Sequence, residues 1–165
     1  MSFTAKKDSF TLGIAAKTVV DSSSKAATAE AGAVNMYSDF ACAVVADGKV
    51  IATLNDAIQP KIEVNAAGEI TKKTFEATKR ELKEGYNMAK YGKPNVAETV
   101  KEWYVQSAAF SNYVVGKTAA EIAGMQTKEV NAHQISTEQA LLDAGCTMQI
   151  TGICAVVAQA ATNAR

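Results

Sequence analysis

The chain has 165 residues, with 17 basic and 17 acidic side chains and no net charge. This length fits one domain over residues 1–165, in which residues 1–27 form a more loosely attached strand and loop. The charge balance excludes the basic surface of a nucleic-acid-binding protein, and no apolar run approaches the roughly 18 residues of a transmembrane segment.

The N-terminus, MSFTAKKDSFTLGIAAK, contains no unbroken apolar segment and no signal cleavage site. The sequence as written therefore predicts a cytoplasmic protein. If a signal or lipobox was removed and replaced by Met1, the protein is extracellular or on the cell surface. Three cysteines, Cys42, Cys146 and Cys154, lack C-x-x-C spacing, which favours buried packing over disulfides or zinc.

The N-terminal half has the pattern of antiparallel strands. Residues 11–20 are β-branched and small, and the polar residues 21–32 predict a loop after them. Two β-prone runs then flank Asp47-Gly48, which favours a tight hairpin with positive φ. A further strand at KIEVNA (61–66) completes a predicted antiparallel meander.

The C-terminal half has the pattern of helices. Residues 74–92, which include Phe75, lean towards helix, and residues 95–117 predict one long amphipathic helix with Gly116 at its cap. Thr118 and Glu121 have capping-box spacing, and Ser136 and Gln139 repeat it. The predicted fold is therefore α+β, an antiparallel meander sheet packed by C-terminal helices.

The stretch LLDAGCTMQITGICAVVAQAA (141–161) predicts a helix that stops at Gly145, a short strand or loop, and a last helix with Thr151 as N-cap. The plain structural alternative is a strand, CTMQI, that pairs into the sheet and buries Cys146 or Thr147.

No nucleotide-binding, hydrolase or zinc-protease motif is present. His133, the only histidine, lies in a stretch that we expect to be a solvated connection between helices. No set of carboxylates is spaced for acid–base work, so the sequence does not support a hydrolase and favours a protein that is not an enzyme.

Four aromatic residues, Trp103, Tyr104, Phe110 and Tyr113, recur along the helix predicted at 95–117. They fit either a ligand pocket or a contact with the sheet. We expect Trp103 and Phe110 in the core, and both interpretations stay open for Tyr104 and Tyr113.

Several stretches together resemble a group of small, largely uncharacterised bacterial proteins of Gram-positive anaerobes, often predicted lipoproteins. They are ADGKVIATLNDAIQPKIEVNAAGEI, TKRELKEGYNM, KEWYVQSAAFSNYVVGKTAAEI and GCTMQITGICAVVAQA. That group is in turn remotely similar to the FMN-binding domain of electron-transport subunits. The resemblance covers residues 28–162.

The resemblance to the FMN-binding domain implies a flavin site. The matching segments are the hairpin at 47–50, the G-K turn at 116–118 and the segment 144–148. The threonine that carries flavin in that family corresponds to Thr147. Ala144 and Cys146 depart from the family's motif, in which a hydroxyl residue and an alanine stand.

Two functions follow as hypotheses. The first is an FMN-binding or small-ligand-binding module in electron transfer, in which Gly145, Cys146, Thr147, Thr151 and Gly152 contact the phosphate and Trp103 or Tyr104 stacks on the ring. The second is a non-enzymatic structural or interaction protein that forms homo-oligomers through Ala-rich helices.

Overall fold

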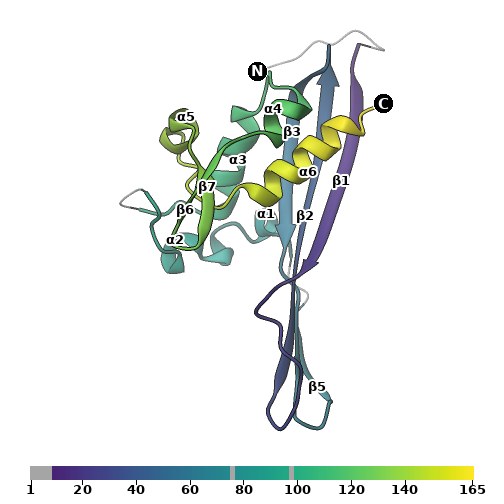
Figure 1. The fold of residues 1–165 in the computed structure, drawn as a ribbon, viewed down its shortest axis with the longest axis vertical. Helices are drawn as coiled ribbons and strands as arrows, with labels where there is room; N and C mark the ends of the chain where they lie inside the picture. The colour runs from purple at the N-terminus through teal and green to yellow at the C-terminus, as the bar shows by residue number, and fades with distance from the viewer. Residues whose placement is uncertain (1–8, 75–76, 97–98) are drawn as a thin grey trace.

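The computed structural model of the chain describes residues 9–74, 77–96 and 99–165. Residues 1–8 of the segment expected to be loosely attached, and Phe75, lie outside these ranges. The α+β class is confirmed, because an antiparallel sheet of N-terminal strands packs against C-terminal helices (Figure 1).

The strands are β1 (Thr11–Val20), β2 (Gly32–Ala46), β3 (Lys49–Ile58), β4 (Lys61–Val64), β5 (Ile70–Thr74), β6 (Thr127–Val130) and β7 (His133–Ser136). The helices are α1 (Lys79–Leu82), η1 (Lys83–Tyr86), α2 (Met88–Tyr91), α3 (Trp103–Tyr113), α4 (Ala119–Ala123), α5 (Gln139–Asp143) and α6 (Thr151–Thr162).

The long strand β2 organises the sheet. It pairs with β1 from Met36 to Val45 on one edge and with β3 from Ser38 to Ala46 on the other. The predicted turn between β2 and β3 is confirmed, with φ of 50° at Asp47 and 73° at Gly48. In one place the pairing differs from a sequential meander, because β4 pairs with the first residues of β2 and not with β3.

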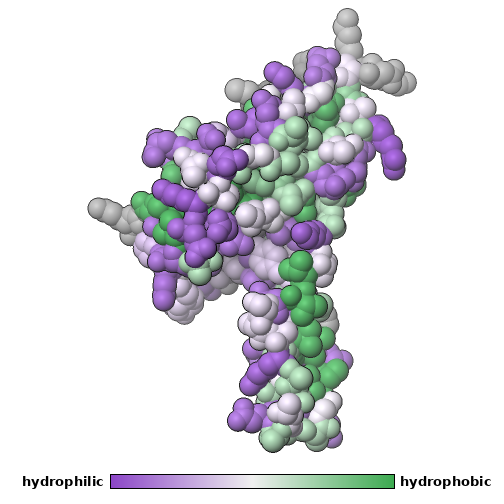
Figure 2. Space-filling view, viewed as in Figure 1, coloured by the Kyte–Doolittle hydropathy of each residue, from purple (hydrophilic) through white to green (hydrophobic). Residues whose placement is uncertain are grey.

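The first residues of β2 project from the body together with β4 and β5 (Figure 1). We call residues 21–35 and 59–74 the arm. It is a narrow antiparallel ribbon on which apolar side chains remain exposed, among them Val34 and Ile70 (Figure 2). A small ribbon in water needs a hydrophobic face against another layer to be stable on its own, and the arm has little buried surface.

The two faces of the three-stranded sheet β1–β2–β3 differ in side-chain size. The inner face, on which α6 lies, carries the small residues Gly13, Ala15, Ala41, Ala43 and Ala57, all buried. The opposite face, which we call the outer face, consists of side chains that pair across the strands: Leu12, Ile14, Ala16, Phe40, Cys42, Val44, Ala52, Leu54 and, opposite Phe40, the buried Asp56. Most of the larger apolar side chains of β1 and β2 therefore point away from α6, and Tyr37 and Val45 are the exceptions that pack against the core.

Helix α6 crosses β1 and β2 diagonally (Figure 1). Its end binds the free edge of β1, because Asn163 Nδ2 donates to the Ile14 carbonyl at 3.0 Å and the Arg165 amide to the Leu12 carbonyl at 3.4 Å. Six of its residues are buried between the sheet and α4: Ile153, Cys154, Val156, Val157, Ala158 and Ala160.

Several helix boundaries differ from the prediction. The long helix predicted at 95–117 is wrong, since α3 begins only at Trp103. The Glu102 carboxylate accepts hydrogen bonds from the Met88 and Ala89 amides at 2.9 and 3.2 Å, which holds Glu102 in an extended conformation at the start of α2. Gly116 has φ of 87° but lies beyond Val114, the C-cap of α3.

The capping box of Thr118 and Glu121 is confirmed. The one proposed for Ser136 and Gln139 is wrong, because α5 begins after Glu138, whose amide donates to the Ser136 hydroxyl. The helix-leaning stretch 74–92 contains three short helical segments, α1, η1 and α2.

His133 was expected in a solvated loop between helices. It is exposed and lies between α4 and α5, as expected, but it belongs to β7, which forms a hairpin with β6, and not to a loop. Asn131 and Ala132 turn the hairpin with φ of 51° and 62°, as a two-residue turn with two positive φ values requires. Among the described residues, no helix is long and apolar enough to cross a membrane.

A substitution at Gly13 tests how closely α6 packs against β1. A Cβ there would overlap the Ala160 carbonyl and the Ala164 amide, which are main-chain atoms. We expect Gly13→Ala to lower the free energy of unfolding by about 1–3 kcal/mol, because the helix must move. Urea unfolding measures this. Gly85→Ala is the control, since nothing lies within 4 Å of a Cβ there; equal losses in both variants would contradict the close contact.

Candidate functional site

A buried lysine lies where β2, α1, η1 and α3 meet. Lys79 is only 4% exposed, and its Nζ donates to the Tyr37 hydroxyl at 3.0 Å. The ammonium lies 4.5 Å from the ring centres of Tyr37 and Tyr86 and 5.4 Å from that of Trp103. We call these four residues the lysine cage. Three aromatic faces around one ammonium give cation–π attraction where water is excluded.

The carboxylates of Asp39 and Asp56 influence the pKa of Lys79. Burial lowers the pKa of Lys79 to about 7, while Asp39 and Asp56 oppose that shift. Burial also raises the pKa of Asp39 to about 6, against the influence of Lys79 and Lys17. Neither carboxylate forms an ion pair with Lys79 within 4 Å. The charge is therefore held by rings and a hydroxyl, with the carboxylates as more distant partners.

The N-terminus of α6 faces Asp39. A Cβ on Gly152 would overlap the Asp39 carboxylate, so that carboxylate lies directly against the first turn of the helix. Negative charge is stabilised at a helix N-terminus by the aligned peptide dipoles. The position at which a flavin phosphate was expected, near Thr151 and Gly152, thus already has an anionic neighbour. Thr151 is the first residue of α6 and Ile150 its N-cap, so the prediction of Thr151 as N-cap is wrong.

The segment that contains Thr147 is held by one glutamine. The fully buried Gln106 of α3 accepts hydrogen bonds at Oε1 from the Thr147 amide at 2.9 Å and the Met148 amide at 2.8 Å. Asn95 Nδ2 donates to the Thr147 carbonyl at 2.9 Å. Residues 146–150 form neither a strand nor a helix, so the strand alternative for CTMQI is wrong.

The break at Gly145 is confirmed, with φ of 92° directly after α5. It turns Cys146 and Thr147 into the interior, where both side chains are buried. The Thr147 hydroxyl lies 3.4 Å from Gln106 Oε1. Burial raises the pKa of both Cys146 and Cys154 to about 12, so these thiols are protonated packing residues.

The two aromatic residues expected to stack on a flavin are separated. Trp103 is buried in the lysine cage, as the core interpretation of its position predicts. Tyr104 lies on the other side of α3, and its hydroxyl donates to Glu84 Oε1 at 2.8 Å. The structure therefore brings Gly145, Cys146 and Thr147 together on one segment but does not place Tyr104 beside them.

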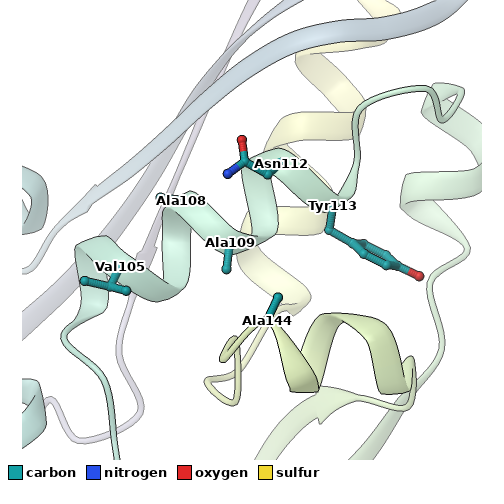
Figure 3. Close-up of a pocket in the computed structure, with 6 residues that line it drawn as sticks. All are labelled: Val105, Ala108, Ala109, Asn112, Tyr113 and Ala144. Atoms are coloured by element: carbon teal, nitrogen blue, oxygen red, sulfur yellow. The ribbon is translucent and has the colours of Figure 1, made fainter. Parts of the chain in front are cut away.

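A shallow groove of about 470 Å³ lies between α3 and the end of α5 (Figure 3). Its lining residues are Val105, Ala108, Ala109, Asn112, Tyr113 and Ala144. The Ala109 and Ala144 side chains point towards one another across it (Figure 3). The Tyr113 hydroxyl is bound to Glu138 Oε2 at 3.0 Å. The groove is mostly apolar and ends next to Gly145.

Sequence reasoning missed Lys79, Asp39, Tyr37 and Gln106. Two signals were available. Tyr37 and Asp39 alternate with Ser38 on β2, which places both on one face of the strand. Thr78 and Glu81 have capping-box spacing, and the structure confirms that box, which would have placed Lys79 in the first turn of a helix. Neither pattern predicts that the side chain of Lys79 is buried.

No family model matches the chain, and neither a curated protein nor a solved structure is significantly similar to it. Among the described residues, no group of three or more His, Cys, Asp or Glu side chains is arranged to hold a metal ion.

The lysine cage predicts how stability depends on pH. The pKa of Lys79 is about 7 in the folded chain against 10.5 ordinarily, so the folded chain binds fewer protons between these values and stability rises from about pH 7 towards 10. The pKa of Asp39 is raised from 3.8 to about 6, so the folded chain binds more protons than the unfolded chain between these values. Stability therefore falls as pH rises from about 4 to 6. We expect least stability between about pH 6 and 7.

Urea unfolding from acid to alkaline pH measures this profile. Lys79→Gln should remove the rise above neutral pH, whereas Lys17→Gln on the exposed end of β1 should keep it. A Lys79→Gln profile that still rises like the wild type would show that Lys79 is not the group responsible.

Proposed function

We propose that this chain is a non-enzymatic interaction module whose binding surface is the outer face of the sheet. The observation that carries the proposal is the exposure of large apolar side chains in the middle of regular strands. Ile14 is 67% exposed, Leu12 51% and Leu54 47%. Contiguous apolar surface of this kind on a soluble protein marks an interaction site.

The distribution of side-chain sizes supports the same conclusion. In a sheet covered on one face, the large apolar residues normally point to the covered side and polar residues to water. Here Gly13 and Ala15 point to the covered side and Leu12 and Ile14 to the exposed one. The exposed residues are therefore arranged as a second packing surface.

The Ala-rich helices, in contrast, are already used within the domain. Only Thr151, Ala155, Gln159 and Thr162 of α6 are exposed, and α3 buries Ser107, Phe110 and Ser111. The hypothesis of an interaction protein is therefore kept, but we assign its contact surface to the sheet and not to the Ala-rich helices.

An apolar dye tests whether the outer face is accessible. We expect anilinonaphthalene sulfonate to fluoresce when mixed with dilute folded protein, because it binds exposed apolar surface. The double variant Ile14→Thr, Leu54→Thr should lose most of that signal without losing stability, since both side chains are exposed. Val115→Thr, at an apolar site 41% exposed outside the sheet, is the control. An unchanged signal in the double variant would count against the proposal.

The second candidate function is noncovalent binding of FMN or another planar ligand, with a role in electron transfer. The groove beside α3 favours it, because a volume of about 470 Å³ lies in the range of small-ligand sites and the groove adjoins Ala144, at the start of the segment that resembles the flavin motif. The buried Thr147 hydroxyl favours noncovalent over covalent attachment.

Absorption and binding measurements test the flavin candidate. We expect FMN fluorescence to be quenched on titration with the protein, and Ala109→Trp to abolish the quenching by filling the groove. Thr147→Ala should leave noncovalent binding unchanged and should abolish flavin absorbance only if the purified protein carries it covalently. A colourless protein that does not quench FMN would eliminate this candidate.

A further inference from the structure

We propose that the occupant of the outer face is a second copy of this chain, packed sheet to sheet about a two-fold axis. This inference rests on the proposed interaction function and names its partner. Two properties of the face support it, its lack of exposed charge and its regular strand geometry, and its area limits the strength of the dimer.

The exposed part of the face carries no charged side chain, and the Cys42 thiol lies at its centre. Asp56, which pairs with Phe40 at one end of the face, is only 6% exposed and accepts hydrogen bonds from the Ala57 and Arg80 amides at 2.8 and 3.1 Å. A partner of a different kind is usually selected by complementary charges at the interface. The exposed part of this face offers none, and a second copy meets it without like-charge repulsion between exposed side chains. The net charge of the whole chain is also zero, which removes long-range repulsion between copies.

The strand geometry fits self-packing. Ile14, Cys42 and Leu54 are paired across three antiparallel strands, so the face is a regular pleated surface. Two such sheets with the same twist pack about 10 Å apart with strand directions within about 30° of each other. In a two-fold dimer both subunits use the same surface patch, so a face that is complementary to itself is sufficient to form the interface.

The area decides the strength of the dimer. The face runs from Leu12 to Ala16 on β1, and about 3.3 Å per residue with about 4.8 Å per strand over three strands gives a flat area of roughly 240 Å². This approaches the size of the largest apolar patch of a typical monomer, but it is small beside the roughly 800 Å² of accessible surface per partner in a standard interface. The expected dimer is therefore weak and reversible.

Sedimentation over a concentration series tests the proposal. We expect the wild type to shift from monomer to dimer as concentration rises. Ile14→Lys and Leu54→Lys should each weaken dimerisation at least tenfold, because the interface would bury two like charges near each other. Val115→Lys is the matched control and should dimerise like the wild type. Circular dichroism confirms that each variant is folded.

Cys42 supplies a second test, chemical cross-linking of the wild-type chain. It lies at the centre of the face and is the only cysteine that is not buried. Sheets about 10 Å apart are too distant for a direct disulfide but bring the two thiols within reach of a short bis-maleimide. We expect a covalent dimer from the wild type at high concentration and none from Cys42→Ala.

The outcomes separate the two proposals. A wild type that stays monomeric at every concentration, yet binds the apolar dye through Ile14 and Leu54, overturns the second copy and leaves the interaction surface standing. A dimer that survives Ile14→Lys and Leu54→Lys, without Cys42 cross-linking, overturns the proposed interface. A wild type that neither binds the apolar dye nor dimerises overturns both the proposed interaction surface and this inference.

Discussion

The close approach of α6 to the inner face of the sheet is the constraint on which the rest of the structure depends. Gly13 leaves room for the Ala160 carbonyl near one end of the helix, and Gly152 leaves room for the Asp39 carboxylate at the other. Between them the sheet presents only small side chains, such as Ala41 and Ala43. Side chains of α6 fill the interior, so the core is built more from the helix than from the sheet.

This arrangement also explains the buried charges. Asp39 continues the row of inner-face residues on β2, at the point where α6 begins, and stabilises the helix N-terminus there. Its desolvation is moderated by Lys79, which is held in turn by Tyr37, Tyr86 and Trp103. The polar cluster thus connects β2, α1 and α3 around the start of α6. Its contacts fix these elements relative to one another.

Local signals predicted the elements that depend on neighbours in sequence. The strand 11–20, the Asp47-Gly48 turn, the Thr118 capping box and the stop at Gly145 each follow from a few adjacent residues. Predictions failed where a distant group decided the outcome. Glu102 caps α2 across fourteen residues, and Gln106 holds residues 147 and 148 from another helix. At the candidate site, the glycine at 145 correctly predicted a broken helix but could not show that Thr147 turns inward.

The β2 strand shows why the missing information matters for function. Its odd positions carry Asp39, Ala41 and Ala43 towards α6, and its even positions carry Phe40, Cys42 and Val44 to the opposite side. Polarity alone hardly distinguishes the two sets, which is why alternation in the sequence was loose. Size distinguishes them. Small residues are needed where a helix backbone must come close, whereas large apolar residues on a solvent-facing sheet gain free energy only when another layer covers them. One strand therefore carries two surfaces that differ in side-chain size, and α6 covers the surface of small residues.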